Sequence, residues 1–254
     1  MRKVVSLAGA ALLVAGPAFA ADLAVNAPVY KAPVAPAFSW TGCYIGADIG
    51  GSWRSRQNAS INPVNENQGS VSGNISGSSA IGGSYAGCNY QFAHSWVVGA
   101  EGDFSWAKLG GSANAPNLFP NGTSAGSGGT SWGSSTDWVA SARARLGYAV
   151  VPNTLVYGTG GAAWTRTNYS GFDQFDNPSF LATSFNDIRT GWVAGAGVDW
   201  APWSNNWILR VEYLHYQFGG VSSTPVVSSP GSFATFNFGE LKIDSVRAGL
   251  SYKF

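Results

Sequence analysis

The last ten residues of the sequence alternate strictly between apolar side chains and polar or small ones. The apolar set consists of Val246, Ala248, Leu250, Tyr252 and Phe254. The polar and small set consists of Ser245, Arg247, Gly249, Ser251 and Lys253. This period of two predicts a β-strand whose two faces meet different surroundings. A strand of a water-soluble sandwich is usually followed by a polar tail, but this sequence ends on an aromatic ring, so we expect its apolar face to meet lipid.

The N-terminal residues predict export. Arg2 and Lys3 precede an apolar stretch, and the small residues Ala18 and Ala20 stand where a signal peptidase cleaves. We expect residues 1–20 to be a cleaved signal peptide, because the apolar stretch is too short to span a bilayer as a helix. No later segment is apolar for long enough to form a transmembrane helix.

Composition favours a barrel with a lipid face over a soluble helical domain. The sequence holds 34 Gly, 14 Phe, 11 Trp and 10 Tyr, with only 11% charged residues. Loss of Arg2 and Lys3 from the 14 Lys and Arg leaves 12, against 13 Asp and Glu. A net charge near zero excludes a basic surface for nucleic acid.

Eight segments repeat the alternation after a proline-rich periplasmic tail at 21–39, and we assign residues 40–254 to the barrel. The predicted strands are residues 40–54, 79–91, 96–107, 137–150, 155–167, 188–201, 207–218 and 241–254. Short connections alternate with four long ones, at 55–78, 108–136, 168–187 and 219–240, and no mature proline lies in a predicted strand. The sequence therefore predicts an all-β protein, an eight-stranded antiparallel up-and-down transmembrane β-barrel with short periplasmic turns and four long outer loops.

Aromatic residues gather at both ends of these segments, whereas a soluble sandwich would bury them near the strand centres. The set beside the short turns is Trp96, Tyr148, Tyr157, Trp200, Trp203, Trp207, Tyr252 and Phe254. The set beside the long connections is Trp53, Trp106, Trp138, Trp164 and Trp192. Two such sets predict two belts at the membrane surfaces.

Several strand segments resemble one family. The stretch Gly191-Trp-Val-Ala-Gly-Ala-Gly-Val-Asp-Trp200 and residues 38–53, 137–148, 156–164, 211–214 and 245–254 are similar to the alphaproteobacterial outer-membrane immunogenic proteins. The resemblance implies an eight-stranded surface-exposed barrel of a Gram-negative outer membrane, with structural and host-contact roles and no catalytic residues. It also implies that the last strand, ending in Phe254, is a signal for the barrel-insertion machinery. Some relatives are said to bind haemin.

Charged residues within the strands are expected to face the lumen. Arg143 and Arg145 alternate with apolar residues, and an arginine facing the lipid midplane costs roughly 2–4 kcal/mol. The same parity points a larger set inward: Asp48, Glu101, Asp103, Arg143, Arg145, Asp199, Arg210, Glu212 and Arg247. Eight strands leave room only for side chains, so we favour an ion-paired plug over a pore lined by charge.

Two cysteines are candidates for a disulfide. Cys43 and Cys88 lie on neighbouring antiparallel segments at directly opposed positions, if the first outer connection is flanked by a pair of Arg54 and Gly77. In an oxidising envelope we favour a cross-strand disulfide over two reduced, lipid-facing thiols. Relatives usually have aromatic residues at both positions.

No catalytic or metal site is predicted, and no cofactor. His94 lies in a short turn and His215 near an outer strand end, so the two cannot share a site. Ser95 follows His94 at the wrong end for a hydrolase that acts on outer-leaflet lipid.

Three functions stay open: a structural barrel contributing to envelope integrity and surface contacts, a protein that binds a host molecule or a small ligand such as haemin through its outer loops, and a narrow porin-like channel. Aromatic residues in the loops are candidate contacts: Phe119, Trp132, Phe172, Phe175, Phe180, Phe233 and Phe236. The alternative is that they pack over the barrel mouth. Expected partners are outer-membrane lipid and lipopolysaccharide, the barrel-insertion machinery and a ligand at the loops.

Overall fold

The computed structural model describes residues 38–63, 71–118, 124–176, 179–203, 206–227 and 233–254. The described residues belong to the unit Ala37–Phe254. The predicted signal peptide and most of the predicted tail therefore lie outside the described residues. None of the described residues belongs to a helix long and apolar enough to cross a membrane.

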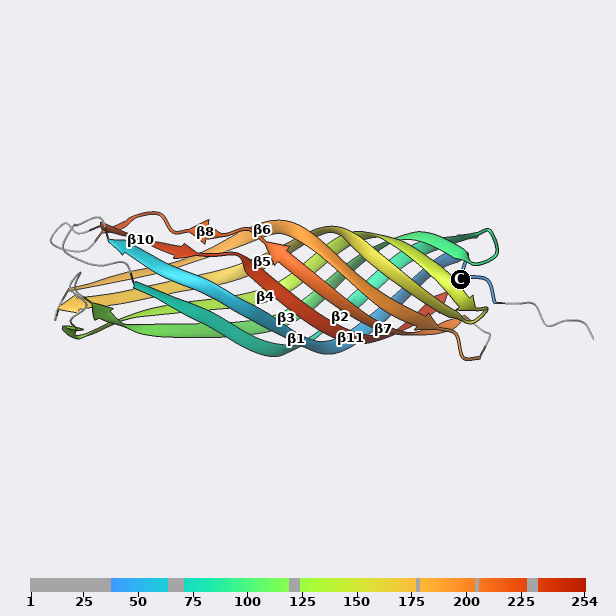
Figure 1. The fold of residues 1–254 in the computed structure, drawn as a ribbon, viewed down its shortest axis with the longest axis horizontal. Helices are drawn as coiled ribbons and strands as arrows, with labels where there is room; N and C mark the ends of the chain where they lie inside the picture. The colour runs from blue at the N-terminus through green and yellow to red at the C-terminus, as the bar shows by residue number, and fades with distance from the viewer. Residues whose placement is uncertain (1–37, 64–70, 119–123, 177–178, 204–205, 228–232) are drawn as a thin grey trace, which may run out of the picture. The chain divides into compact units, whose positions relative to one another are not determined.

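Eight long antiparallel strands of the second unit form a closed ring (Figure 1). They are β1 Gly42–Pro63, β2 Val71–Phe92, β3 Trp96–Leu118, β4 Ser124–Val151, β5 Thr154–Asp176, β6 Ser179–Trp200, β7 Trp207–Phe218 and β11 Leu241–Lys253. Each pairs with its neighbour in the chain, except that β7 pairs with β11. The predicted antiparallel β-barrel is confirmed.

The ring closes between β1 and β11, and the register runs from Tyr44 opposite Lys253 to Arg54 opposite Ile243. Beyond a bulge between Arg54 and Gln57, β1 instead pairs with a short strand, β10 Phe233–Phe238. Two further short strands, β8 Val221–Ser222 and β9 Val226–Val227, pair with β10. The three short strands therefore extend the sheet from β1, beyond the point where β7 and β11 end.

The predicted long loops are mostly strand, which corrects the boundaries at 55–78, 108–136 and 168–187. β1 to β6 run on through these ranges as regular antiparallel ladders, which β4 and β5 continue to Thr130 opposite Asp173. Gly, Ser and Asn have low strand propensity, but ladder hydrogen bonds and an apolar inner face outweigh that preference. Pro63 and Pro116 thus lie within strands, contrary to prediction; Pro116 adjoins an irregularity in the ladder, a position that tolerates proline.

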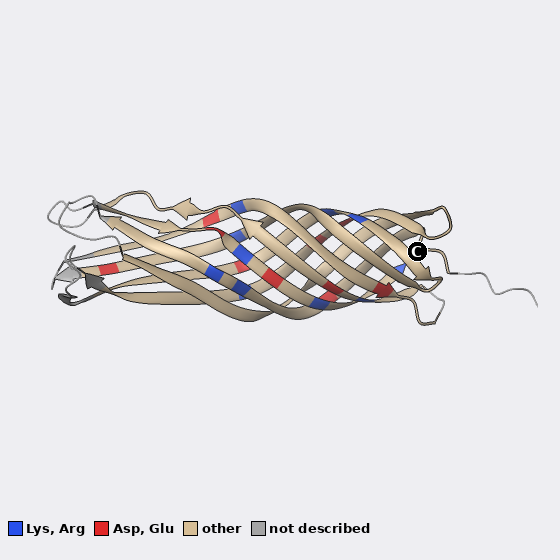
Figure 2. Ribbon diagram, viewed as in Figure 1, with Lys and Arg blue, Asp and Glu red and all other residues tan. Residues whose placement is uncertain are grey.

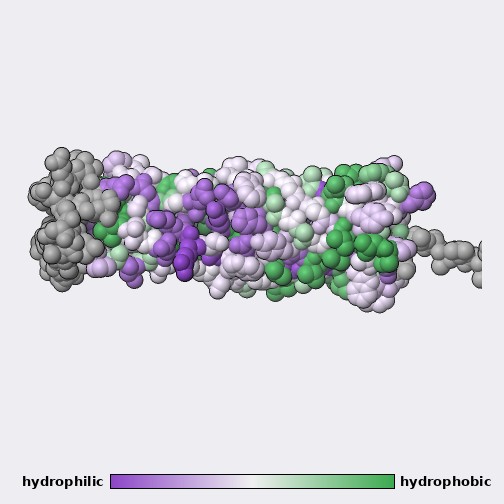
Figure 3. Space-filling view, viewed as in Figure 1, coloured by the Kyte–Doolittle hydropathy of each residue, from purple (hydrophilic) through white to green (hydrophobic). Residues whose placement is uncertain are grey.

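The side chains alternate between the two faces of the wall, as the period of two predicts. Outward aromatic residues include Trp106 and Trp192 at one level and Trp200 and Trp207 at another, all at least two-fifths exposed. We call these levels the outer belt and the inner belt, and treat the strand segments between them as membrane-spanning. Figure 3 shows apolar residues gathered toward the short-turn end on the face in view, with hydrophilic residues farther along.

Tyr157 was expected in the inner belt, and this is wrong. Its ring is 3% exposed and its hydroxyl points into the lumen, where it donates a hydrogen bond to Glu212. Tyr157 alternates with the outward Val156 and Gly158, so the parity of β5 overrides its nearness to a turn.

Candidate functional site: the charged lumen

Nine charged side chains meet inside the ring at the membrane-spanning level. We call this set the charged layer: Asp48, Glu101, Asp103, Arg143, Arg145, Asp199, Arg210, Glu212 and Arg247. They come from β1, β3, β4, β6, β7 and β11, and each stands at an inward position of its strand. Figure 2 shows acidic and basic positions on neighbouring strands of the wall. The structure brings together all nine residues that the sequence analysis assigned to the lumen.

Glu101 is the centre of the charged layer. Its carboxylate oxygens lie 2.6 Å from Arg143, 2.7 Å from Arg210 and 3.3 Å from Arg145. The Tyr44 hydroxyl donates a further hydrogen bond of 2.7 Å. One carboxylate that is 4% exposed therefore serves three guanidinium groups.

Two other carboxylates complete the pairing around Glu101. Asp199 lies 2.7 Å from Arg145 and 2.8 Å from Arg210, so these two arginines share both acids. Glu212 lies 3.1 Å from the Arg143 guanidinium and also accepts the hydrogen bond of Tyr157. Shared partners fix the arginines in one arrangement, which favours a rigid lumen.

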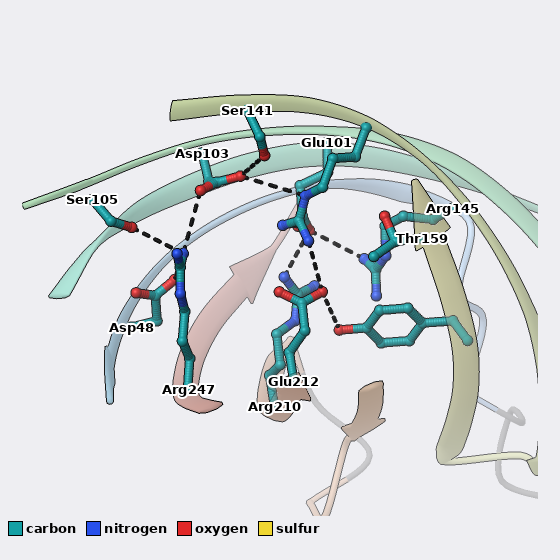
Figure 4. Close-up of polar contacts among 12 residues, drawn as sticks. Asp48, Glu101, Asp103, Ser105, Ser141, Arg145, Thr159, Arg210, Glu212 and Arg247 are labelled. Atoms are coloured by element: carbon teal, nitrogen blue, oxygen red, sulfur yellow. Dashed lines mark hydrogen bonds and ion pairs between the residues drawn. The ribbon is translucent and has the colours of Figure 1, made fainter. Parts of the chain in front are cut away.

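Arg247 organises the opposite side of the charged layer (Figure 4). Its guanidinium lies 3.3 Å from Asp103 and 3.8 Å from Asp48, and it donates hydrogen bonds to Ser105 and to the Tyr216 hydroxyl. Ser141 donates to Asp103. Arg247 is fully enclosed, so its charge is balanced by these partners alone.

Aromatic rings add to the enclosure of the arginines. The guanidinium carbon of Arg145 lies 3.8 Å from the centre of the Tyr157 ring, and that of Arg210 lies 4.2 Å from the Tyr85 ring. These contacts are cation–π interactions, which gain strength where water is excluded. The tyrosines Tyr44, Tyr85, Tyr157 and Tyr216 were missed by the sequence analysis, although their strand parity alone would have pointed them inward.

Apolar side chains bound the charged layer at both ends. At the short-turn end lies the inner apolar layer of Trp40, Val97, Ala149, Leu155, Tyr157, Ala201 and Ile208. On the other side lies the middle apolar layer of Leu109, Val139, Ala163, Val193, Leu214, Tyr216, Phe218, Leu241 and Ile243. Along β4, for example, Arg143 and Arg145 fall between Val139 and Ala149. The charges of this layer are thus paired with one another between two apolar layers.

The structure joins Cys43 and Cys88 by a disulfide. The residues stand directly opposite each other in the β1–β2 ladder, with their Cα atoms 4.0 Å apart. Cys43 belongs to the outward face of β1 near the short turns. The bond therefore links β1 to β2 at the short-turn end of the barrel.

Replacing both cysteines with alanine is expected to lower the free energy of unfolding by about 2–4 kcal/mol, because the bond closes a loop of 45 residues in the unfolded chain. Urea titration of the folded, unboiled species would measure the loss. Reduced wild-type protein serves as the control and should match the variant. Equal midpoints for oxidised wild type and variant would contradict the expectation.

The candidate aromatic contacts do not form one outward group. Trp132 and Phe236 are at most 1% exposed and pack inside the ring, so their assignment as ligand contacts is wrong. Both stand at inward positions of strands, within ranges that the sequence predicts to be loops. Phe172 faces outward and is 38% exposed. Phe119 lies outside the described residues, as do the side chains of Phe175, Phe180 and Phe233.

The two histidines lie at different ends of the wall. His94 is in the turn between β2 and β3, in the left-handed backbone region, and His215 lies on the outward face of β7. The His215 Nδ1 atom is 2.7 Å from Asp244, and the Ser55 hydroxyl bonds the same carboxylate rather than the imidazole. In a serine hydrolase the serine hydroxyl bonds the imidazole, which in turn bonds the carboxylate. The contact of Ser55 with Asp244 does not have this arrangement. Within the described part of the chain, no cluster of three metal-ligating side chains occurs.

The predicted insertion-signal residues share one outward face of β11. Val246 and Leu250 are each 44% exposed and Tyr252 is 42% exposed, and Ala248 lies between them on the same face. Phe254 follows at 72% exposure, and its backbone N–H donates to the Cys43 carbonyl oxygen. This face is available to lipid.

Known proteins similar to this chain are outer-membrane proteins. Residues 7–254 match the family described as the outer membrane protein beta-barrel domain. The 31 kDa outer-membrane immunogenic protein of Brucella melitensis is 36% identical, over 99% of this chain and 100% of the relative, and the 25 kDa outer-membrane immunogenic protein of Brucella abortus is 30% identical over 100% and 99%. The outer membrane protein OprG from Pseudomonas aeruginosa superposes with a TM-score of 0.49 at 10% identity, covering 84% of this chain and 97% of that one.

These relatives are named as immunogenic outer-membrane proteins and not as enzymes. The chain matches these relatives over its full length, and its structure is an antiparallel ring of strands with apolar outward faces. The chain therefore belongs to the outer-membrane β-barrel family of the outer-membrane immunogenic proteins, and it resides in the outer membrane of a Gram-negative bacterium.

Proposed function

We propose that the protein is a structural barrel whose closed lumen braces the outer membrane and whose strand extensions outside the membrane offer a rigid surface for contacts. The observation that carries this proposal is the charged layer, in which every arginine pairs with at least one carboxylate between two apolar layers. Side chains that fill the lumen keep the wall from collapsing and leave no continuous water path.

A planar lipid bilayer tests the closed lumen. Purified, folded protein is expected to give no reproducible single-channel steps, because moving an ion through would require the ion pairs of Glu101 to separate. A porin reconstituted in the same membrane is the positive control. Reproducible steps that change when Arg143 and Arg145 are both replaced by alanine would favour the narrow channel instead.

Lipid contact is supported by the outward cations just beyond the outer belt. Arg56 follows Trp53 by three residues, while Lys108 and Arg166 follow Trp106 and Trp164 by two. Lys242, on β11, is a fourth, with a side chain that is 42% exposed. Cations at this height suit the phosphate groups of lipopolysaccharide, and the apolar outward face of β11 supports the insertion machinery as a partner.

The alternative of ligand capture depends on exposed aromatic rings. With Trp132 and Phe236 enclosed, Phe172 is the candidate that remains among the described side chains. Its ring stands on the outward face of β5, beyond the outer belt, where a host molecule or haemin would approach. A surface made of hydrogen-bonded strands suits contacts of fixed shape better than contacts that require a mobile loop.

A further inference from the structure

A second polar group lies inside the ring, beyond the outer belt. It consists of Arg54, Gln57, Thr136, Thr167, Tyr169 and Arg189, and we call it the outer polar layer. Along β5, Thr167 falls between Ala163 of the middle apolar layer and Tyr169. Along β6, Arg189 falls between Val193 of that layer and Leu181. Leu181 belongs to an outer apolar layer of Ala59, Ile61, Ile75, Trp132, Tyr169, Leu181, Ala234, Phe236 and Phe238.

The two arginines of this layer lack the pairing that their counterparts in the charged layer have. Arg189 is 5% exposed, and its Nε, Nη1 and Nη2 atoms form no hydrogen bond. Arg54 is 4% exposed; it bonds the Leu109 carbonyl oxygen, Thr136 and Gln57, but its Nε atom has no partner. Among the described residues, no ion pair joins either guanidinium to a carboxylate.

The two arginines of the outer polar layer lie near Tyr169. The Arg189 guanidinium carbon lies 4.8 Å from the centre of the Tyr169 ring. Arg54 donates a hydrogen bond to Thr136, whose hydroxyl lies 3.3 Å from the hydroxyl of Thr167, the preceding inward residue of β5 before Tyr169. The Tyr169 hydroxyl is buried beside Thr167, but no acceptor meets hydrogen-bond geometry with it. Five donor atoms without an acceptor therefore belong to three neighbouring side chains.

Two like charges in such a layer need a counter-charge. Burial lowers the pKa of the Arg189 guanidinium, with Tyr169 and Asp187 acting in the opposite direction. A guanidinium nevertheless keeps its proton in proteins, so the charge persists. An unpaired buried charge is costly, and Asp187, two residues away on the same strand, forms no ion pair with it. An anion with several acceptor oxygens would satisfy the orphaned donors.

We propose that Arg54, Arg189 and Tyr169 form a buried binding site for a small oxyanion of the phosphate or sulfate class. Two planar guanidiniums and a hydroxyl offer donors on more than one side, which suits a tetrahedral oxyanion better than a single-point anion such as chloride. The site lies between two apolar layers, so the anion is enclosed as the barrel closes. Its role is to neutralise the outer polar layer.

Inorganic phosphate is the probe for this site. Full-length protein is refolded in detergent with phosphate, or with sodium chloride at the same ionic strength, and thermal unfolding is followed by the loss of the unboiled gel species. Phosphate is expected to raise the midpoint by about 5–10 °C once it exceeds its dissociation constant a hundredfold. Equal midpoints in the two salts would overturn the proposal.

Arg189→Met removes the inward charge and keeps the length of the side chain. This variant is expected to lose the dependence on phosphate, while Lys253→Met, which removes a cation at the short-turn end of β11, keeps it. An Arg189→Met protein that still responds to phosphate would overturn the site. If that variant does not fold, phosphorus NMR of wild-type protein after removal of free phosphate decides: a retained phosphate signal supports the site, and its absence refutes it.

Discussion

Glu101→Gln is expected to lower the free energy of unfolding by at least about 3–5 kcal/mol, the cost of removing one partner of a buried ion pair. The amide keeps the shape of the side chain but not its charge, and it turns an –NH₂ group toward arginines. Because Arg143, Arg145 and Arg210 all bond Glu101, three guanidiniums lose a partner at once. Urea titration of folded protein in lipid vesicles would measure the difference.

Glu240→Gln is the matched control for this prediction. The Glu240 side chain is 56% exposed and pairs with Lys242 at the surface, so its loss is expected to change stability by no more than about 0.5 kcal/mol. Combining Glu101→Gln with Arg145→Met should cost less than the sum of the two single changes, because the double variant removes one of the stranded charges. Equal stability of Glu101→Gln and wild type would refute the central role of Glu101.

Gly161→Val is expected to prevent the barrel from forming. Gly161 stands opposite Arg143, where β5 runs so close to β4 that a Cβ atom would lie 2.0 Å from the Ala142 carbonyl oxygen and 2.7 Å from the Arg143 Cα atom. Backbone atoms cannot move aside as a flexible side chain would, so the two strands would have to separate. The unboiled species that migrates faster in a detergent gel should be missing.

The neighbouring glycine provides the control. A Cβ atom at Gly160 would meet nothing closer than the Val193 carbonyl oxygen at 3.6 Å, which is ordinary contact. Gly160→Val is therefore expected to fold and to show the gel shift. A folded Gly161→Val protein would mean that the approach of β4 and β5 is not rigid.

Strand parity predicted the lumen well because it depends on a local rule that the whole ring obeys. An arginine such as Arg143, placed between alanines on a strand, avoids lipid only by facing the lumen. The inward orientation of the carboxylates on β3 and β7 follows in the same way from the parity of those strands. Parity does not predict which arginine pairs with which carboxylate, because that depends on the stagger between strands. Parity also determines the orientation of Tyr157, although this residue lies near a turn.

The outer half of the barrel was harder to predict because composition and long-range pairing point in opposite directions there. Segments rich in Gly, Ser and Asn have the composition of loops, yet each finds a neighbour strand and buries Ile75, Trp132 or Phe236. The predicted first strand ends at Arg54, and the bulge that follows this residue shifts the parity of β1. Arg189 stood at the edge of a predicted strand and was not assigned to the lumen.

The continuation of the strands beyond the outer belt restricts how such a sequence can change its length. One inserted residue in the outer part of β4 or β5 would exchange the inward and outward faces of everything beyond it. It would turn the enclosed ring of Tyr169 outward and a serine into the apolar interior. Relatives are therefore expected to differ in the length of these strands by even numbers of residues, matched across each hairpin, and odd insertions should be confined to the hairpin tips or to bulges.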